Sequence, residues 1–202
     1  MWQEIKQRYT LSDKQLEQLQ RYAAMLIEWN EKFNLTAITQ EKDVLMHHIK
    51  DSLELSHCID LSTIKGIADI GSGGGLPGIP LAILNPDCLS VLIEVTSKKV
   101  SFLEHVAKEL GLVNVQVYSQ DWLTFLRKTD YKIDLMCARA SLQVDDLLRA
   151  LRPSSPYAHA QLVYWASRHW KPTEQQKKLL KEEYNYTVGD KERRYIIFSG
   201  SK

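Results

Sequence analysis

The sequence contains few cysteines, and none stands in a pattern typical of metal binding or of a disulfide framework. Cys58, Cys88 and Cys137 are odd in number and far apart, and no CxxC pair occurs. We therefore expect all three to be small buried hydrophobic residues. The sequence predicts neither a zinc knuckle nor any other metal site.

Long apolar runs are absent as well. The apolar stretches are short and are interrupted by charged residues, glycine or proline, so no membrane span is predicted. The first residues, MWQEIKQRYT, lack the apolar core of a signal peptide. With 44% apolar and 25% charged residues, the composition is that of an ordinary soluble domain. We expect a cytoplasmic protein without membrane partners, and a monomer.

The chain as a whole carries almost no net charge, with a formal value of +1. Residues 1–126 nevertheless hold 11 Lys/Arg against 16 Asp/Glu, which gives −5, whereas residues 127–202 hold 15 against 9, which gives +6. The basic part indicates either a face that attracts phosphate groups or a solvated surface that interleaves with the acidic part in space.

Two amphipathic helices are predicted before any strand. Residues 12–32 carry a capping-box pattern at Ser12 and Gln15, followed by apolar positions at helical spacing, and a second helix is expected over residues 41–58. Strands and helices then alternate. We expect strands at 67–70, 90–93, 115–118, 133–137, 161–165 and 194–198, and helices at 98–110, 145–151 and 173–183.

This alternation predicts an α/β fold with a mostly parallel, Rossmann-like sheet, in which ligands bind at the carboxyl ends of the strands. We expect an N-terminal helical extension over residues 1–60 and one catalytic domain over residues 61–202.

A glycine-rich turn follows the first predicted strand and precedes a helix, and it reads Asp69-Ile-Gly71-Ser-Gly73-Gly-Gly75-Leu76-Pro77-Gly78. Glycines there permit positive φ angles and let the backbone approach a ligand closely. Gly73, Gly75 and Gly78 match the dinucleotide pattern GxGxxG, but Asp69 with the next three alternate glycines matches the acidic-start motif of methyltransferases. A carboxylate would repel a pyrophosphate, whereas it could attract the amino group or sulfonium of S-adenosylmethionine.

Polar and aromatic residues stand at the ends of the next strands. Glu94 can accept hydrogen bonds from ribose hydroxyls, which both NAD and S-adenosylmethionine contain. Asp121 and Trp122 could contact an adenine by hydrogen bonding and stacking, although Trp122 could equally be a core aromatic residue. Arg139 is expected to face the ligand crevice or to form a surface ion pair.

Several motifs, in matching order and spacing over residues 29–148, resemble those of the bacterial 16S ribosomal RNA guanine-N7 methyltransferase family, also described as glucose-inhibited division protein B. They are Trp29-Asn-Glu-Lys-Phe-Asn34-Leu35-Thr36, His48-Ile-Lys-Asp51-Ser52, the glycine-rich turn with its extension to Ile79-Pro80, Lys98-Lys99-Val-Ser-Phe102-Leu103, and Ala138-Arg139-Ala140.

The resemblance implies a seven-stranded methyltransferase fold with a helical extension, S-adenosylmethionine as methyl donor, and 16S ribosomal RNA or the 30S subunit as partner. Carried onto the matching positions, it implies cofactor contacts at Gly71, Leu76, Asp121, Trp122 and Arg139. The turn itself and the end of the second strand add Gly73 and Glu94 as expected cofactor residues. The chain departs from the family pattern at His47, where arginine is usual, and after Arg152, where it reads Pro-Ser-Ser-Pro and later Tyr164-Trp165-Ala166-Ser167. These departures lie where the acceptor would bind.

Guanine N7 has a free lone pair and the sulfonium leaves as a neutral thioether, so the expected chemistry needs neither acid nor base and no single catalytic residue is predicted. Motifs for other methylations are missing, since no cysteine follows a proline and no Asn/Asp-Pro-Pro-aromatic segment occurs. A methyltransferase for a protein or small molecule, a non-catalytic RNA-binding protein and a NAD-dependent oxidoreductase stay open as alternatives.

Contacts with RNA phosphates are expected from basic residues, which would position the RNA without specifying the base. The candidates are Lys98, Lys99, Arg193 and Arg194, with Arg139, Arg127 and Lys128 as further ones. His48 and Asp51, three residues apart on a helix, are expected either to form a structural pair or to shape the acceptor pocket.

Overall fold

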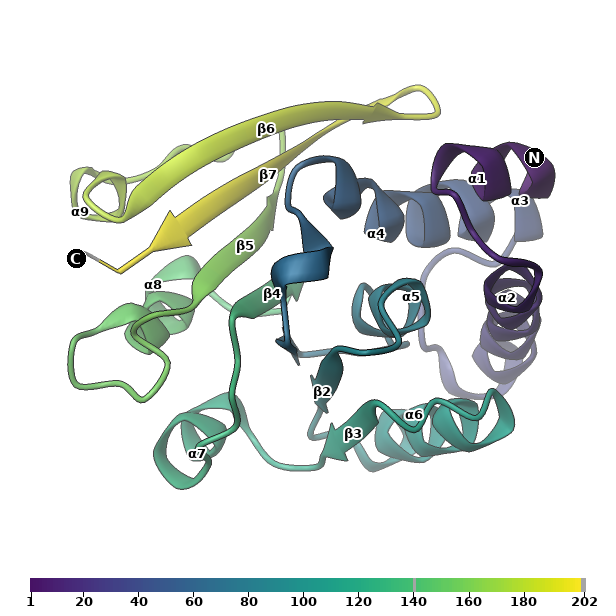
Figure 1. The fold of residues 1–202 in the computed structure, drawn as a ribbon, viewed down its shortest axis with the longest axis horizontal. Coiled ribbons are helices and arrows are strands. Elements are labelled where there is room, and N and C mark those ends of the chain that lie inside the picture. Colours follow the sequence, from purple (N-terminus) through teal and green to yellow (C-terminus); the bar gives the residue numbers. More distant parts are fainter. Residues whose placement is uncertain (140, 201–202) are drawn as a thin grey trace.

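The computed structural model describes residues 1–139 and 141–200. Its centre is a seven-stranded sheet with the strand order β3-β2-β1-β4-β5-β7-β6 (Figure 1). Strands β1 to β5 are parallel to one another, whereas β7 is antiparallel to both β5 and β6. The strands are β1 (Gly66–Ile70), β2 (Leu89–Ile93), β3 (Val115–Tyr118), β4 (Leu135–Arg139), β5 (Gln161–Ala166), β6 (Leu180–Val188) and β7 (Lys191–Ser199).

The central strands are buried on both faces, as a parallel sheet covered by helices requires. All five residues of β1 are buried, which explains why its side chains, apart from Asp69, are small or apolar. Helices cover one face with α2 (Asp13–Phe33), α5 (Gly78–Leu84) and α6 (Ser97–Glu109), and the other with α7 (Trp122–Lys128) and α8 (Val144–Leu147). The α/β prediction and the six predicted strands are confirmed, with small shifts of their ends.

The N-terminal helices pack directly on the sheet domain. Leu19, Tyr22 and Leu26 of α2 share one hydrophobic cluster with Ile79 of α5 and Phe102 of α6. Helix α1 (Trp2–Arg8) precedes them, and Ser12 and Gln15 form the predicted capping box of α2. The division into residues 1–60 and 61–202 stays a prediction. Among the described residues, no helix is both long and apolar enough to cross a membrane.

The segment predicted as one helix over residues 41–58 is helical but changes its type three times. It consists of α3 (Glu41–Val44), the π-helical segment η1 (Leu45–Lys50), α4 (Asp51–Leu53) and the 3-10 turn η2 (Glu54–His57). π-helical turns are often found at functional sites. Here η1 carries His47 and His48 and leads into Asp51.

The predicted helix over residues 173–183 is wrong. Only α9 (Glu174–Lys177) is helical, and β6 follows it. Tyr184, Tyr186 and Val188 alternate with exposed polar residues, which is the period of a strand, but Lys181, Glu182 and Glu183 hide this signal. Such charges are usual on an edge strand because they discourage pairing with other chains. The predicted helix over 145–151 is likewise split into α8 and the 3-10 turn η4 (Leu148–Leu151), and a 3-10 turn η3 (Leu61–Thr63) precedes β1.

The cysteine prediction holds for two of the three residues. Cys88 and Cys137 are buried, whereas Cys58 is only partly buried, and all three are free thiols.

Candidate active site

A first cavity of about 320 Å³ lies at the carboxyl ends of β1 and β2, where the sequence predicts a ligand. The glycine-rich turn, the end of β2, the start of α7 and the loop after β4 surround it. Its lining residues are Ile70, Gly71, Ile93, Glu94, Val95, Lys99, Gln120, Asp121, Trp122, Ser141 and Leu142.

The glycine-rich turn needs its glycines for two different reasons. Gly71, Gly73 and Gly75 have φ angles of 71°, 59° and 89°, which side chains disfavour. A Cβ atom on Gly71 would also lie only 2.5 Å from the Cβ of Ser141, across the turn. The N–H groups of Gly71 and Ser72 donate to the carbonyl of Ile93 at 2.9 and 3.0 Å, which fixes the turn against the end of β2.

Glu94 closes the cavity from the end of β2. Its carboxylate accepts from the N–H groups of Gly73 at 2.9 Å, Val95 at 3.0 Å and Thr96 at 2.9 Å. Although burial opposes ionisation, the hydrogen bonds from Thr96 and Gly73 outweigh it and hold the pKa of Glu94 below its ordinary value. An ionised carboxylate offers about four acceptor positions, so capacity for a ligand hydroxyl remains.

Asp121 and Trp122 line the cavity, but their polar atoms are already engaged. Asp121 caps α7 and accepts from the backbone N–H of Thr124 at 3.0 Å and from its hydroxyl at 2.7 Å. The Trp122 indole is 4% exposed, stacks on Phe125 and donates to the carbonyl of Asp146 at 3.2 Å. Both readings of Trp122 therefore apply, since it is a core residue and a wall of the cavity.

The other predicted cofactor residues lie apart from the lining of the first cavity. Gly73 stands at its rim through the contact with Glu94, whereas Leu76 is buried in the cluster under α2. Arg139 lines a second cavity instead. Direct cofactor contacts of these three residues stay predictions.

Asp69 is buried under the turn and is not exposed to the cavity. One carboxylate oxygen accepts from the N–H of Gly78 at 3.0 Å, which fixes the start of α5, and the other oxygen has no partner among the described residues. Burial raises the pKa of Asp69 to about 7. The residue thus supports the turn from below, a role that the motif alone does not indicate.

This buried carboxyl predicts a pH dependence of stability. Because the folded-state pKa lies above the ordinary 3.8, the unfolded chain ionises first, and the contribution present below pH 3.8 is lost as the pH rises through 7. Between pH 5 and 7 the free energy of unfolding should fall by about 2 kcal/mol from this group. Urea titrations at each pH should show that Asp69→Asn flattens this slope, and an unchanged slope would contradict the assignment.

The second cavity, of about 420 Å³, lies beside the end of β4, between η1 and the β6–β7 hairpin. Its lining residues are Ile38, His47, His48, Asp51, Arg139, Tyr164, Trp165, Ala166, Ser167, Tyr186, Arg193 and Arg194. Tyr164 to Ser167 of this lining stand in the segment where the sequence departs from the family pattern and where the acceptor is expected, whereas Tyr186 is not predicted because the start of β6 resembles a helix.

Asp51 is the centre of a hydrogen-bond network in this cavity. Its carboxylate accepts from Arg139 at 3.0 Å and from the Tyr186 hydroxyl at 2.9 Å, and its side chain is 3% exposed. The expected pairing of His48 with Asp51 is replaced by a shared contact, since both bind Arg139.

Burial, followed by the charge of Arg139, lowers the pKa of His48 to about 3 and keeps the ring neutral at pH 7. Nδ1 lies 3.1 Å from an Arg139 nitrogen and Nε2 lies 2.7 Å from the Thr36 hydroxyl. Nδ1 also lies 3.0 Å from the carbonyl oxygen of His47, so this ring nitrogen contacts both a donor, the Arg139 guanidinium, and an acceptor, the carbonyl.

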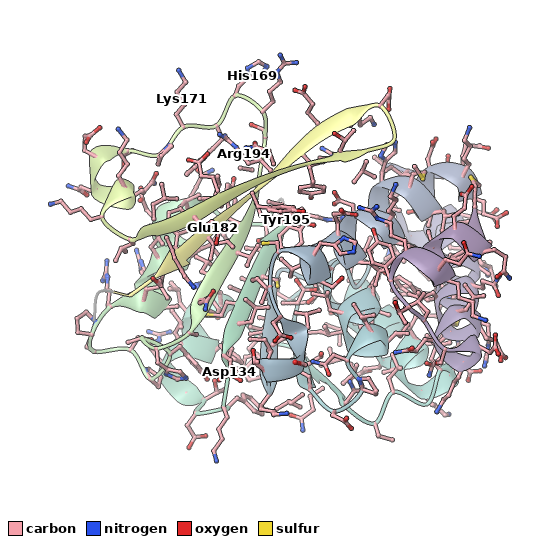
Figure 2. All side chains as sticks on the ribbon, turned by 45° about the horizontal axis from the view of Figure 1, so that its top comes forward. Asp134, His169, Lys171, Glu182, Arg194 and Tyr195 are labelled. Carbon is pink, nitrogen blue, oxygen red and sulfur yellow. The ribbon has the colours of Figure 1, made fainter. Side chains whose placement is uncertain are left out.

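The candidate RNA-binding residues fall into different surroundings. Lys98 lies over the ring of Phe33, Lys99 lines the first cavity, and Arg193 lines the second. Arg194 contacts Glu183 at 3.2 Å and donates to the carbonyls of Ser167 and Trp170, so it attaches the loop after β5 to the hairpin. Figure 2 shows Arg194 between the two, whereas His169 and Lys171 point away from the protein.

The fold is that of the Rossmann-like methyltransferases, as comparison with solved structures shows. The methyltransferase domain of METTL16 covers 90% of this chain and 80% of its own at a TM-score of 0.61 and 13% identity. The human methyltransferase 10 domain containing protein covers 74% and 81% at a TM-score of 0.56 and 12% identity.

The family follows from sequence comparison. Residues 15–193 match the family described as rRNA small subunit methyltransferase G, and the chain belongs to it. Proteins named ribosomal RNA small subunit methyltransferase G from Halalkalibacterium halodurans, Geobacillus and Chromobacterium violaceum are 38%, 39% and 40% identical over 65%, 71% and 70% of this chain. The aligned parts span 56%, 61% and 66% of those relatives.

Proposed function

We propose that this protein transfers a methyl group from S-adenosylmethionine to N7 of a guanosine in 16S ribosomal RNA. The observation that carries the proposal is the family match over residues 15–193, together with a cavity where a glycine-rich turn faces an ionised Glu94. The acceptor would be the free RNA or the 30S subunit, and the protein would act as a cytoplasmic monomer.

The first cavity fits the cofactor by its chemistry. Glu94 has acceptor capacity for ribose hydroxyls, and the buried hydroxyl of Ser141, which lines the cavity beside Gly71, has no partner among the described residues. Asp121 and Trp122 would border the adenine, and the volume of about 320 Å³ falls in the range of small-molecule sites. S-adenosylmethionine bound there would supply the methyl group on a sulfonium.

The chain's own residues would act mainly by alignment. In-line geometry can contribute on the order of 7–11 kcal/mol to such a reaction, and N7 needs no base. The second cavity would hold the guanosine, with the buried Asp51 network fixing Arg139 at the end of β4 between the two ligands. The aromatic walls of the cavity would stabilise the positive charge that the purine acquires.

The direct test is transfer of a radiolabelled methyl group to unmodified 30S subunits and to free 16S RNA. Glu94→Gln should raise the KM for S-adenosylmethionine about tenfold or more, because hydrogen bonds to a charged acceptor are lost. Glu182→Gln is the matched control, since Figure 2 shows Glu182 on the outer strand β6, far from β2 in the strand order.

Label in the RNA that maps to guanine N7 supports the proposal. An absence of label in both substrates, from a folded protein that binds S-adenosylmethionine, refutes it and redirects the search to protein and small-molecule acceptors. If Glu94→Gln and Glu182→Gln transfer methyl groups with equal KM values for S-adenosylmethionine, Glu94 does not contact the cofactor.

A further inference from the structure

The second cavity gathers buried nitrogen atoms that lack hydrogen-bond partners. Seven buried side-chain atoms are unpartnered among the described residues, and four belong to residues that line this cavity: His47 Nδ1, Trp165 Nε1, Arg193 Nε and Arg194 Nε. An unpartnered buried donor costs about 1–3 kcal/mol, so native proteins rarely keep one without a reason. The last three are N–H donors at any physiological pH, which indicates a ligand rich in acceptor atoms.

The charge of the lining points the same way. Three arginines face one aspartate, and burial lowers the pKa of His47 as well as that of His48, so neither ring adds charge at pH 7. The Asp51 oxygens already accept from Arg139 and Tyr186, and Arg193 Nε is 3.8 Å from one of them. Glu183 lies outside the lining but neutralises Arg194 at 3.2 Å, so three arginines against two carboxylates leave an excess of one positive charge at the cavity.

Of the three arginines, only Arg193 keeps its terminal nitrogens available. The terminal nitrogens of Arg139 contact Asp51 and His48. Those of Arg194 contact Glu183 and the carbonyls of Ser167 and Trp170. Across the described part of the chain, the terminal nitrogens of Arg193 have no hydrogen-bond acceptor. A guanidinium fork of this kind suits two oxygens of a phosphate.

Strand register brings Trp165 to the same place. Trp165 pairs with Tyr195 across β5 and β7, and Arg193 precedes Tyr195 by two residues, so the three side chains share one face of the sheet. The Trp165 ring is 9% exposed and rests edge-on against Tyr195 with 4.8 Å between ring centroids, which holds the indole in place.

We propose that Trp165 Nε1 and the Arg193 guanidinium form a phosphate subsite in the second cavity, which binds the phosphate of the acceptor nucleotide. The proposal rests on the proposed function for the identity of that nucleotide. Arg194 takes no part, because its guanidinium holds the loop after β5. The subsite would position the nucleotide through its phosphate and leave recognition of the base to other groups.

The test uses the indole resonances of the full-length protein labelled with ¹⁵N-tryptophan. The chain has five tryptophans, and Trp165→Phe identifies the signal of Trp165. Inorganic phosphate, guanosine 5′-monophosphate and guanosine are titrated separately. We expect the two phosphates to move the Trp165 proton downfield, the nucleotide at lower concentration, and guanosine to move it less because it lacks the phosphate.

Two variants measure the contribution of each donor by calorimetry. Trp165→Phe keeps the contact with Tyr195 but removes the N–H, and Arg193→Gln removes the fork. Each should weaken binding of guanosine 5′-monophosphate about tenfold or more, as expected for a hydrogen bond to a charged group. Arg168→Gln is the control, since it removes one exposed arginine from the neighbouring loop, where its pairing with Glu192 is solvent-exposed.

An unmoved Trp165 resonance at millimolar phosphate overturns the subsite, as does an equal response to guanosine and its monophosphate. If Arg193→Gln and Arg168→Gln weaken nucleotide binding equally, the effect comes from net charge alone, and the subsite is also overturned. These titrations contain neither methyl donor nor ribosomal RNA. Phosphate binding without methyl transfer would thus refute only the proposed function. Methyl transfer without phosphate binding at Trp165 and Arg193 would refute only the subsite.

Discussion

Replacing Gly71 with alanine should lower methyl transfer about 100-fold or more, because displacement of a cofactor-positioning turn by about 1 Å has effects of this size. The added Cβ would lie 2.5 Å from that of Ser141 while φ is 71°. The turn and the loop after β4 must then separate, which deforms the first cavity on two sides. Calorimetry with S-adenosylmethionine should show the corresponding loss of affinity.

Gly111→Ala is the control for backbone strain. Gly111 has a φ of 62°, but a Cβ atom there would have no neighbour within 4 Å. This variant should lose only about 1–2 kcal/mol of stability from the left-handed conformation and bind the cofactor normally. If Gly71→Ala binds as well as Gly111→Ala, the loop after β4 adapts freely and the turn does not define the cofactor site.

Asp51→Ala should lower the free energy of unfolding by about 3–5 kcal/mol, since it strands a charge in a buried network. The Arg139 side chain is only 16% exposed and would lose its carboxylate, and the Tyr186 hydroxyl would lose its acceptor. Urea denaturation measures the loss. Methyl transfer should fall with it, because Arg139 would no longer be held at the end of β4.

A double-mutant cycle separates this network from a general loss of packing. Adding Arg139→Ala to Asp51→Ala should cost much less than the sum of the single changes, because no partner is left stranded. Strict additivity would contradict the network. Asp134→Asn is a second control, since Asp134 accepts from the N–H groups of Lys65 and Gly66 at the amino ends of β1 and β4, opposite to both cavities (Figure 2). It should reduce stability without changing the affinity for a nucleotide.

The sequence is sufficient to predict those parts of the structure that depend on residues close to one another in the chain. Glycines at 71, 73 and 75, the cap at Ser12 and the apolar strand before Asp69 each reflect a short-range constraint, and all three were identified. Glu94 was found for the same reason, because an acidic residue at a strand end has a fixed spacing from the turn.

The second cavity could be predicted only in part. The sequence places His47 and residues 164–167 near the acceptor, but the way the lining residues meet depends on tertiary contacts. Trp165 and Arg193 are brought together by an antiparallel pairing, and Asp51 meets Tyr186 across 135 positions of sequence. The charged start of β6 also resembled a helix. Arg194 shows a further limit of prediction from sequence. The residue type alone does not distinguish an arginine that contacts a phosphate from one that holds a loop in place.

The long separation between Asp51 and Tyr186 has a consequence for synthesis of the chain. Every residue that lines the first cavity lies at or before position 142, whereas the second cavity needs β7, whose last lining residue is Arg194. Translation therefore delivers every residue that lines the first cavity before it delivers the outer wall of the second. Asp51, Tyr186 and Arg193 meet only when the final strand has been made, so the second cavity is the last part of this end of the sheet to be completed.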